Sequence, residues 1–189
     1  MEGRPPDEQE LIERSCNGDT EAFGALVRTH QKAALRVAFL VVRDRAEAED
    51  VTQEAFVNAY NALGRFRAGS PFRPWMLRIV RNEALNRVRG RKRQEFYARQ
   101  LFTESVPGGA APSPETILVA DSSRSAVLAA MERLPEKYRA VLYHRYLIDL
   151  SEAEVARVLG IPRGTVKSRA SRGLTRLRTL LEAEGWNHK

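Results

Sequence analysis

Residues 103–116 read TESVPGGAAPSPET, with three prolines, two glycines and no apolar periodicity. Proline removes a backbone donor and glycine adds conformational freedom, so this composition is typical of a linker and not of a helix or strand. Fully extended, the 14 residues span on the order of 45 Å. We therefore expect two domains, residues 1–102 and residues 117–189, joined by a flexible linker over residues 103–116.

Both halves have the apolar spacing of helices. Apolar residues recur at intervals of three and four, and no alternating strand pattern occurs, which predicts an all-α fold of two small helical domains. In the first half, Asp19 and Asp44 are expected to cap helices, and a separate helix is expected from about His30 to Val42. In the second half, helices are expected near residues 117–133, 136–147, 152–159 and 163–183.

Cysteine content and hydropathy restrict the compartment. Cys16 is the only cysteine, which excludes an intrachain disulfide and favours a reducing environment. We interpret it as a small buried apolar side chain and not as a redox switch. The longest apolar stretch, residues 37–42, is too short to span a bilayer, and the start MEGRPPDEQE lacks a signal-peptide core. A cytoplasmic protein without membrane insertion is expected.

Positive charge is concentrated in two parts of the chain. The net charge is +7, and 26 of the 31 basic residues are arginine. Residues 1–64 carry 7 basic and 12 acidic side chains, whereas residues 65–99 carry 11 basic and two acidic ones. A second run, from Arg163 to Arg178, has six basic residues and no acid. Arginine matches phosphates and guanine edges, so this pattern favours a nucleic-acid partner; a genome-wide arginine bias would spread more evenly.

The stretch GIPRGTVKSR, residues 160–169, lies between two expected helices. Ser151, followed by two glutamates, is a typical start of the first helix. Gly160 permits the left-handed conformation that ends it, and Pro162 precedes the second helix. A helix, a short turn with glycine and a second helix have the spacing of a helix-turn-helix.

The helix after Pro162 has two kinds of face. Its apolar stripe consists of Val166, Ala170, Leu174 and Leu177. Another face carries side chains able to reach base edges in the major groove, namely Lys167, Ser168, Ser171, Arg172 and Thr175. The flanking cations Arg163, Arg169, Arg176 and Arg178 are suited to phosphates. An amphipathic helix with a solvated basic face is the simpler alternative.

With these motifs in view, the sequence resembles the extracytoplasmic-function (ECF) sigma factors of bacterial RNA polymerase. The resemblance rests on AEAEDVTQEAFVNAYNAL (46–63), on FRAGSPFRPWMLRIVRNEALNRVRGRKR (66–93) and on the helix-turn-helix stretch within residues 134–178. It implies a region 2 domain that binds core RNA polymerase and the −10 element, and a region 4 domain that binds the −35 element of promoter DNA. It also implies regulation by an anti-sigma factor, often membrane-bound.

The resemblance assigns roles to residues of the first half. Asp50, Gln53 and Glu54 match positions that dock on the polymerase clamp, and their spacing places them on one helix face; an ordinary exposed acidic face is the alternative. The residues matching the −10 segment are Phe66, Phe72, Trp75, Arg78, Arg81, Asn82, Arg87 and Arg89. Within this set, Asn82 matches a position that helps to bind a flipped base, and Trp75 also has the spacing of a core residue.

In the second half the resemblance makes Lys167, Ser168, Ser171 and Arg172 base-edge candidates. It makes Arg163, Thr165 and Arg169 phosphate contacts. The chain departs from the usual GTVKSRLxRAR pattern by placing Ala170 and Gly173 inside the helix. Glycine costs a helix roughly 1 kcal/mol relative to alanine, and Ala170 leaves space in the core, so the motif alone does not predict how this helix packs or its exact −35 preference.

Two other classes of function remain as alternatives. A stand-alone helix-turn-helix regulator would share the second half but leaves residues 46–93 unexplained. An enzyme is disfavoured because His30, His144 and His188 show no metal-ligand spacing with Cys16, and because the chain lacks a phosphate-binding glycine loop and a nucleophile motif. We therefore expect no cofactor, no metal and no catalytic residue.

Overall fold

The computed structural model describes residues 7–67, 69–101 and 122–184, and every regular element in them is helical. The expected all-α fold is confirmed. The chain divides into two compact units, Met1–Ala110 and Ala111–Lys189. The proposed linker, residues 103–116, lies outside the described residues.

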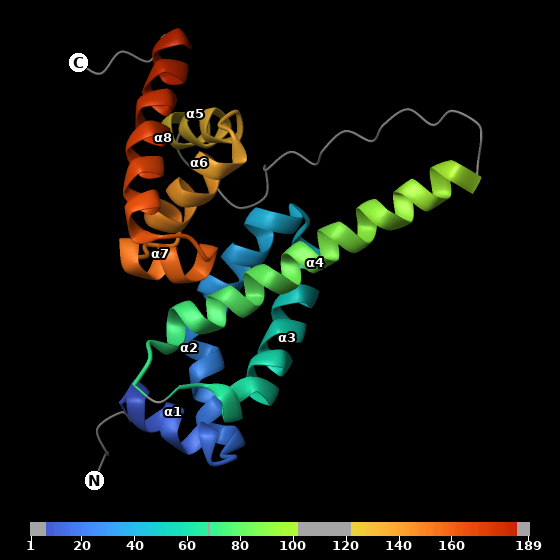
Figure 1. Cartoon of the computed structure of the whole chain (residues 1–189), viewed down its shortest axis with the longest axis vertical. Helices are drawn as coiled ribbons and strands as arrows, with labels where there is room; N and C mark the ends of the chain where they lie inside the picture. The colour runs from blue at the N-terminus through green and yellow to red at the C-terminus, as the bar shows by residue number, and fades with distance from the viewer. Residues whose placement is uncertain (1–6, 68, 102–121, 185–189) are drawn as a thin grey trace. The chain divides into compact units, whose positions relative to one another are not determined.

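The described residues of the first unit form four α-helices, drawn from blue to yellow-green in Figure 1. They are α1 (Glu8–Cys16), α2 (Thr20–Val42), α3 (Arg45–Ala62) and α4 (Phe72–Leu101), with a 3₁₀ turn, η1 (Leu63–Arg65), after α3. Helices α2, α3 and α4 pack against one another, and α1 packs against α2. Many buried side chains at these contacts are alanines, including Ala34, Ala48, Ala55, Ala59 and Ala84. Such small side chains allow the helix backbones to approach closely.

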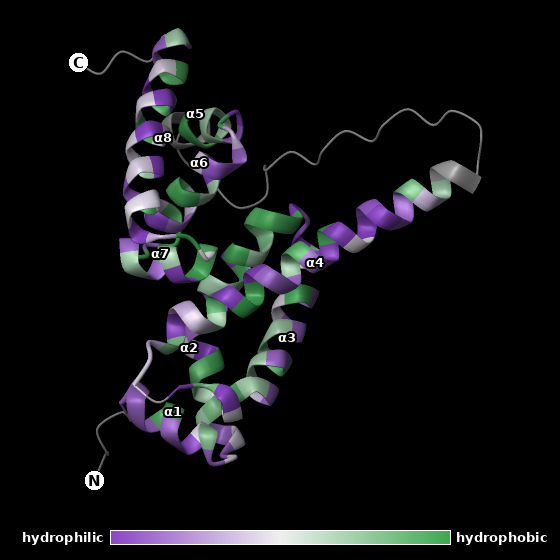
Figure 2. Ribbon diagram, viewed as in Figure 1, coloured by the Kyte–Doolittle hydropathy of each residue, from purple (hydrophilic) through white to green (hydrophobic). Residues whose placement is uncertain are grey.

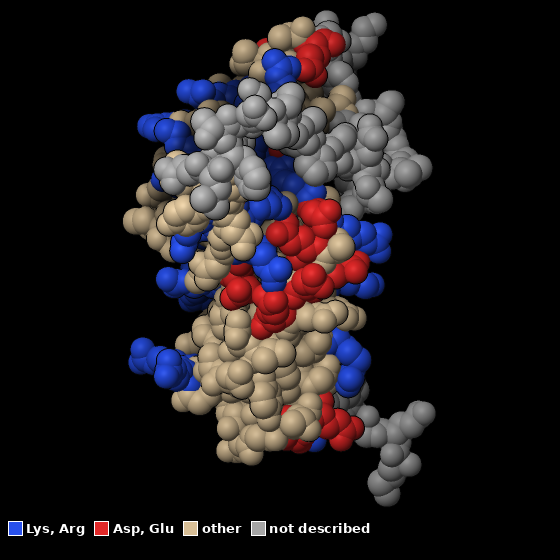
Figure 3. Space-filling model, turned by 90° about the vertical axis from the view of Figure 1, so that its right-hand side faces the viewer, with Lys and Arg blue, Asp and Glu red and all other residues tan. Residues whose placement is uncertain are grey.

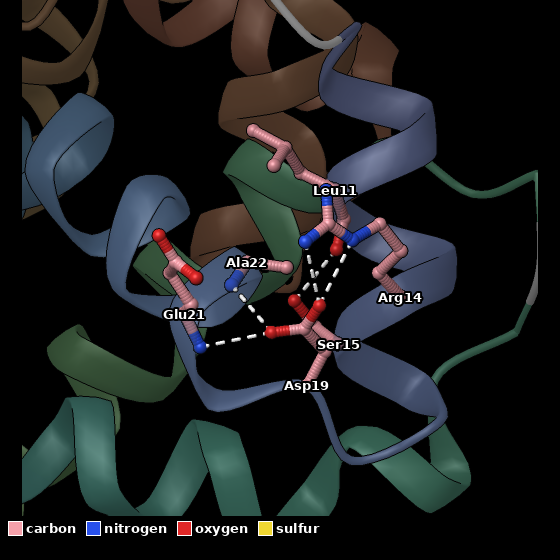
Figure 4. Close-up of polar contacts among 6 residues, drawn as sticks. All are labelled: Leu11, Arg14, Ser15, Asp19, Glu21 and Ala22. Atoms are coloured by element: carbon pink, nitrogen blue, oxygen red, sulfur yellow. Dashed lines mark hydrogen bonds and ion pairs between the residues drawn. The ribbon is translucent and has the colours of Figure 1, made fainter.

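The turn between α1 and α2 is organised by Asp19 (Figure 4). Its Oδ1 accepts hydrogen bonds from the amides of Glu21 and Ala22, both at 3.0 Å. Its Oδ2 lies 2.7 Å from Nη2 of Arg14. The Ala22 amide, followed by the Arg14 guanidinium, lowers the pKa of the Asp19 carboxyl, which therefore stays ionised at the positive end of α2. The expected cap is confirmed.

The expected separate helix from His30 is wrong, because α2 continues from Thr20 to Val42 without a break. No proline occurs in this stretch, and its one glycine, Gly24, lies in the helix. His30 is instead a buried position on the inner side of α2, and its ring lies 5.6 Å from that of Phe72. Helix α3 begins as expected, with Asp44 accepting a hydrogen bond from the Glu47 amide at 2.8 Å.

The interpretation of Cys16 as a buried side chain is also wrong. Cys16 is the last residue of α1 and is exposed. Its Sγ lies 3.9 Å from the carbonyl oxygen of Leu63. The apolar face of this short helix is formed by Leu11 and Ile12, which leaves Cys16 at the solvent side of the helix end.

The second unit contains α5 (Ser122–Glu132), α6 (Glu136–Leu142), α7 (Glu152–Leu159) and α8 (Arg163–Ala183). A π-helical turn, η2 (Tyr143–Leu147), continues α6, where one regular helix over residues 136–147 was expected. Helix α8 packs against α5, α6 and α7. The helix-turn-helix is confirmed in its details: Ser151 and Glu154 form a reciprocal capping box, and Gly160 is left-handed at φ 66°.

Gly173 lies inside α8 because α6 approaches closely there. A Cβ atom at this position would lie 3.2 Å from Cδ1 of Leu142 and 3.3 Å from Cβ of Tyr138. The departure from the family pattern at Gly173 therefore falls where an added methyl group would be tight against α6. Leu174, expected in the apolar stripe, is 42% exposed, and the buried stripe is formed by Val166, Gly173 and Leu177.

We predict that Gly173→Ala destabilises the protein. Because Leu142 is fully buried, the added methyl group overpacks the α6–α8 contact, at a cost of about 1–3 kcal/mol that outweighs the gain in helix propensity. Urea unfolding measures the change. Gly90→Ala is the matched control, because a Cβ at this helical glycine meets nothing within 4 Å; it should stabilise by about 0.4–1 kcal/mol. A stabilised Gly173→Ala protein would contradict this packing.

We predict that acid destabilises the first unit through His30. Burial lowers the pKa of His30 below 6.5, the neighbouring Glu8 acts in the opposite direction, and Arg73 lowers it further. The unfolded chain therefore binds the proton more readily. The contribution of neutral His30 to the free energy of unfolding is fully present above pH 6.5. It decreases as the pH falls toward the pKa of His30 in the folded protein. Urea unfolding between about pH 7.5 and pH 5.5 should show this decrease, and His30→Leu should make the slope smaller.

Candidate polymerase and promoter interfaces

The polar side of α8 faces away from the rest of its unit. At 100° per residue, Ser168, Ser171 and Arg172 project from the side opposite the buried stripe of Val166 and Leu177. Lys167 lies at the edge of the same side, and all four polar side chains are exposed. The base-edge candidates therefore share one solvent-facing surface. Serine and arginine side chains on such a surface can donate to bases in a major groove.

The three phosphate candidates are placed less uniformly. Arg163 is exposed at the first turn of α8, where its Nε lies 3.6 Å from Oε2 of Glu152 at the start of α7. Thr165 and Arg169 are half-buried. The Thr165 carbonyl accepts a hydrogen bond from the Ser168 hydroxyl at 3.2 Å. Arg163 flanks the exposed polar surface of α8 on the side of Lys167, and Thr165 and Arg169 flank it on the opposite side, next to Arg172.

Helix α4 carries the candidates for the −10 element, and the structure separates them into two faces. Arg78, Asn82 and Arg89 are exposed and lie within a sector of about 40° on the side away from α2 and α3. Arg81 is half-buried and lies about 60° from Arg78, outside that sector. Arg87 projects from the opposite side, toward α3. Arg87 therefore lies on a different face of α4 from Arg78, Asn82 and Arg89.

Arg87 is paired with one of the residues proposed to bind the polymerase. Its Nη2 lies 2.7 Å from Oε1 of Glu54, and this hydrogen bond is the main cause of the raised pKa of Arg87. One turn further along α4, Nη1 of Arg91 lies 2.8 Å from Oε2 of Glu47. Acidic and basic side chains accordingly lie interspersed on the face shown in Figure 3. The sequence alone did not predict that Glu47 and Arg91 form an ion pair. In both pairs, Arg87–Glu54 and Arg91–Glu47, the partners are more than 30 positions apart in the chain.

The clamp candidates share an exposed face of α3. Asp50, Gln53 and Glu54 are all exposed and lie within a sector of about 100°. Asp50 has no ion-pair partner among the described residues, whereas Glu54 has Arg87. This face can therefore offer one unpaired carboxylate and one carboxylate held by a neighbouring helix to a cationic partner.

The aromatic candidates form a cluster at the start of α4. The ring centroid of Phe66 lies 4.9 Å from that of Trp75 and 5.8 Å from that of Phe72. Phe72 is only 2% exposed, so its ring is a core element; the expectation that it meets DNA is not supported. Phe66 and Trp75 are half-buried. Trp75 has the sequence spacing of a core residue, yet part of its ring is accessible to solvent.

No group of three or more His, Cys, Asp and Glu side chains is arranged to hold a metal ion in the described part of the chain. None of the helices described there is long and apolar enough to cross a membrane.

Comparison with known proteins assigns both units. The sigma-70 region 2 profile matches residues 26–94, and the sigma-70 region 4 profile matches residues 124–177. The RNA polymerase sigma-H factor of Pseudomonas aeruginosa is 38% identical over 171 residues, covering 87% of this chain and 89% of that protein. The ECF RNA polymerase sigma-E factor of Escherichia coli K12 is 36% identical, with coverage of 87% and 89%. This chain belongs to the ECF sigma factors.

Two solved structures resemble this chain in fold. CnrH in complex with the cytosolic domain of CnrY matches with a TM-score of 0.68 and 27% identity, covering 93% of this chain and 97% of that one. The sigma factor RpoE from Bartonella quintana, in complex with the anti-sigma factor NepR, matches with a TM-score of 0.66 and 27% identity, over 85% and 96% of the two chains. The fold of this sigma factor is therefore that of relatives crystallised with protein partners.

We predict that Glu54 and Arg87 are energetically coupled. The two side chains are 50% and 35% exposed, which limits the coupling to about 0.2–1 kcal/mol. A double-mutant cycle with Glu54→Ala and Arg87→Ala, measured by urea unfolding, gives this value, and added salt should reduce it. Arg78→Ala replaces Arg87→Ala in the control cycle, where additivity is expected. Additive effects in both cycles would show that the pair contributes nothing to stability.

Proposed function

We propose that this ECF sigma factor binds core RNA polymerase, recognises the −35 and −10 elements of its promoters and aids DNA melting. One observation carries the proposal: the exposed side of α8 presents hydrogen-bonding side chains and cations with no acidic residue between Arg163 and Arg178. RNA synthesis belongs to the polymerase, so the chain itself is not an enzyme and uses no cofactor.

The −35 element is read by α8. Lys167, Ser168, Ser171 and Arg172 contact base edges in the major groove. Arg163, Thr165 and Arg169 contact the phosphates that set the register of the helix. The support for this division is the exposure of the first four residues and the flanking position of the other three.

The −10 element is held by the outer face of α4. Arg78 and Arg89, with Arg81 to one side, attract the backbone of the melted strand, and Asn82 binds an extruded base. The half-buried rings of Phe66 and Trp75 offer an apolar wall beside them. Phe72 is buried and supports the rings of Phe66 and Trp75 from the core side.

Core polymerase is bound by α3 through Asp50, Gln53 and Glu54. Their exposed carboxylates and amide fit a basic surface on the partner. Region 2 functions reside in residues 1–102 and region 4 functions in residues 117–189. The solved complex of the sigma factor RpoE with the anti-sigma factor NepR supports regulation of this chain by an anti-sigma factor.

The proposed function is tested by transcription in vitro with core polymerase and a promoter library. Enrichment of templates that share paired −35 and −10 sequences is the expected result, and it identifies both elements at once. Unselective transcription would reject promoter recognition. Sequence-specific DNA binding without any effect on core polymerase would instead favour a stand-alone regulator.

We predict that Arg172→Ala lowers transcription from the selected promoter without weakening binding to core polymerase. Loss of one good base contact costs about 1–3 kcal/mol, so promoter affinity should fall by roughly tenfold. Lys137→Ala is the matched control, since it removes one exposed charge of the same unit from α6. Unchanged transcription with Arg172→Ala would remove Arg172 from the reading surface.

A further inference from the structure

Helix α4 is longer than the helices against which it packs. It has 30 residues, against 23 in α2 and 18 in α3. Its last buried side chain is Ala84, and residues 91–98 are all exposed. Figure 1 shows this yellow-green end of α4 continuing past α2 and α3. We refer to residues 91–98 as the α4 overhang.

The overhang carries two large aromatic rings on a basic helix. Phe96 is 58% exposed and Tyr97 is 57% exposed, and their ring centroids lie 6.0 Å apart. No other described residue makes a ring contact with either side chain. The preceding turn contains Arg91, Lys92 and Arg93, with Glu95 as the one acid among residues 91–98. This part of α4 is accordingly mostly hydrophilic in Figure 2, with apolar colour near its end.

Phe96 continues the exposed face that holds the −10 candidates. Five full turns of an α-helix take 18 residues, so Phe96 lies on the same side of α4 as Arg78 and about 27 Å along the axis. Arg89 falls between them within the same sector of about 40°, and Arg93 lies about 60° from their common line. A single exposed track of cations therefore runs along α4 and ends at an aromatic ring.

We propose that the α4 overhang is an additional binding site for single-stranded DNA, in which Phe96 and Tyr97 stack on unpaired bases and Lys92 and Arg93 hold the phosphates. The inference rests on the proposed function, because it extends the promoter-binding face of α4. Aromatic rings beside cations are the combination that binds unpaired nucleotides without sequence preference. The sigma-70 region 2 profile ends at residue 94, before both aromatic residues.

Charge favours nucleic acid over a protein as the occupant. A protein segment that covered the rings would also have to neutralise Lys92, Arg93 and the nearby Arg89, for which the overhang supplies only Glu95. Arg91 is already paired with Glu47. A polynucleotide supplies both the planar bases and the regularly spaced negative charges that this surface lacks.

The test measures binding of the full chain to a fluorescent single-stranded oligodeoxynucleotide of mixed sequence and to the matching duplex, by fluorescence anisotropy. Phe96→Ala with Tyr97→Ala should weaken single-strand binding about tenfold and leave duplex binding nearly unchanged. Phe96→Trp with Tyr97→Trp should retain the affinity, because the larger rings still stack. Val57→Ala, at a residue of α3 that is 60% exposed, is the control for loss of an exposed apolar side chain.

Three outcomes would overturn the inference: no binding of the single strand by the unsubstituted chain, equal single-strand affinity in the alanine variant, or an equal loss of duplex binding. Weaker binding of the alanine variant to core polymerase, with single-strand affinity unchanged, would make the overhang a protein contact. Transcription of the promoter library is measured separately. An alanine variant that is active there but unaltered in single-strand binding would refute this site and leave the proposed function intact.

Discussion

The burial of one side of α4 against α2 and α3 is the contact on which the arrangement of the first unit depends. Met76, Leu77, Val80 and Ala84 are fully buried along that side. Their burial fixes the rotation of α4 about its own axis, and with it the direction of every arginine on the helix. Arg78 and Arg89 consequently face solvent, whereas Arg87 and Arg91 face the acidic residues of α3.

The rotation of α4 also brings the face proposed to bind core polymerase into contact with the helix proposed to bind the −10 element. Glu54 belongs to the face proposed to bind core polymerase, and it is held by an arginine from the helix proposed to bind the −10 element. The Glu54–Arg87 ion pair is partly exposed to solvent, so it contributes little to stability and another cation can readily replace Arg87. A cationic surface that approached α3 would compete with Arg87 and Arg91 for the same carboxylates.

In the second unit the close approach of α6 and α8 fixes the rotation of α8, as the packing on α2 and α3 fixes that of α4. Gly173 allows Leu142 and Tyr138 to lie directly on the α8 backbone, and this contact orients α8. Ser168, Ser171 and Arg172 then project from the opposite side. A glycine that weakens the helix in isolation thus contributes to the surface proposed to read DNA, because it sets the distance at which α8 packs.

Local signals in the sequence determined the helical class, the capping of α2, α3 and α7 by Asp19, Asp44 and Ser151, and the turn at Gly160. Each of these depends on residues within a few positions of one another. The tertiary structure alone decided that Phe72 is buried, that Arg87 faces Glu54 and that Phe96 continues the exposed track of α4. Arginines occur on all sides of α4, so its sequence does not specify which of them meet solvent. That choice is made by contacts with helices distant in the chain, whose packing sets the rotation of α4.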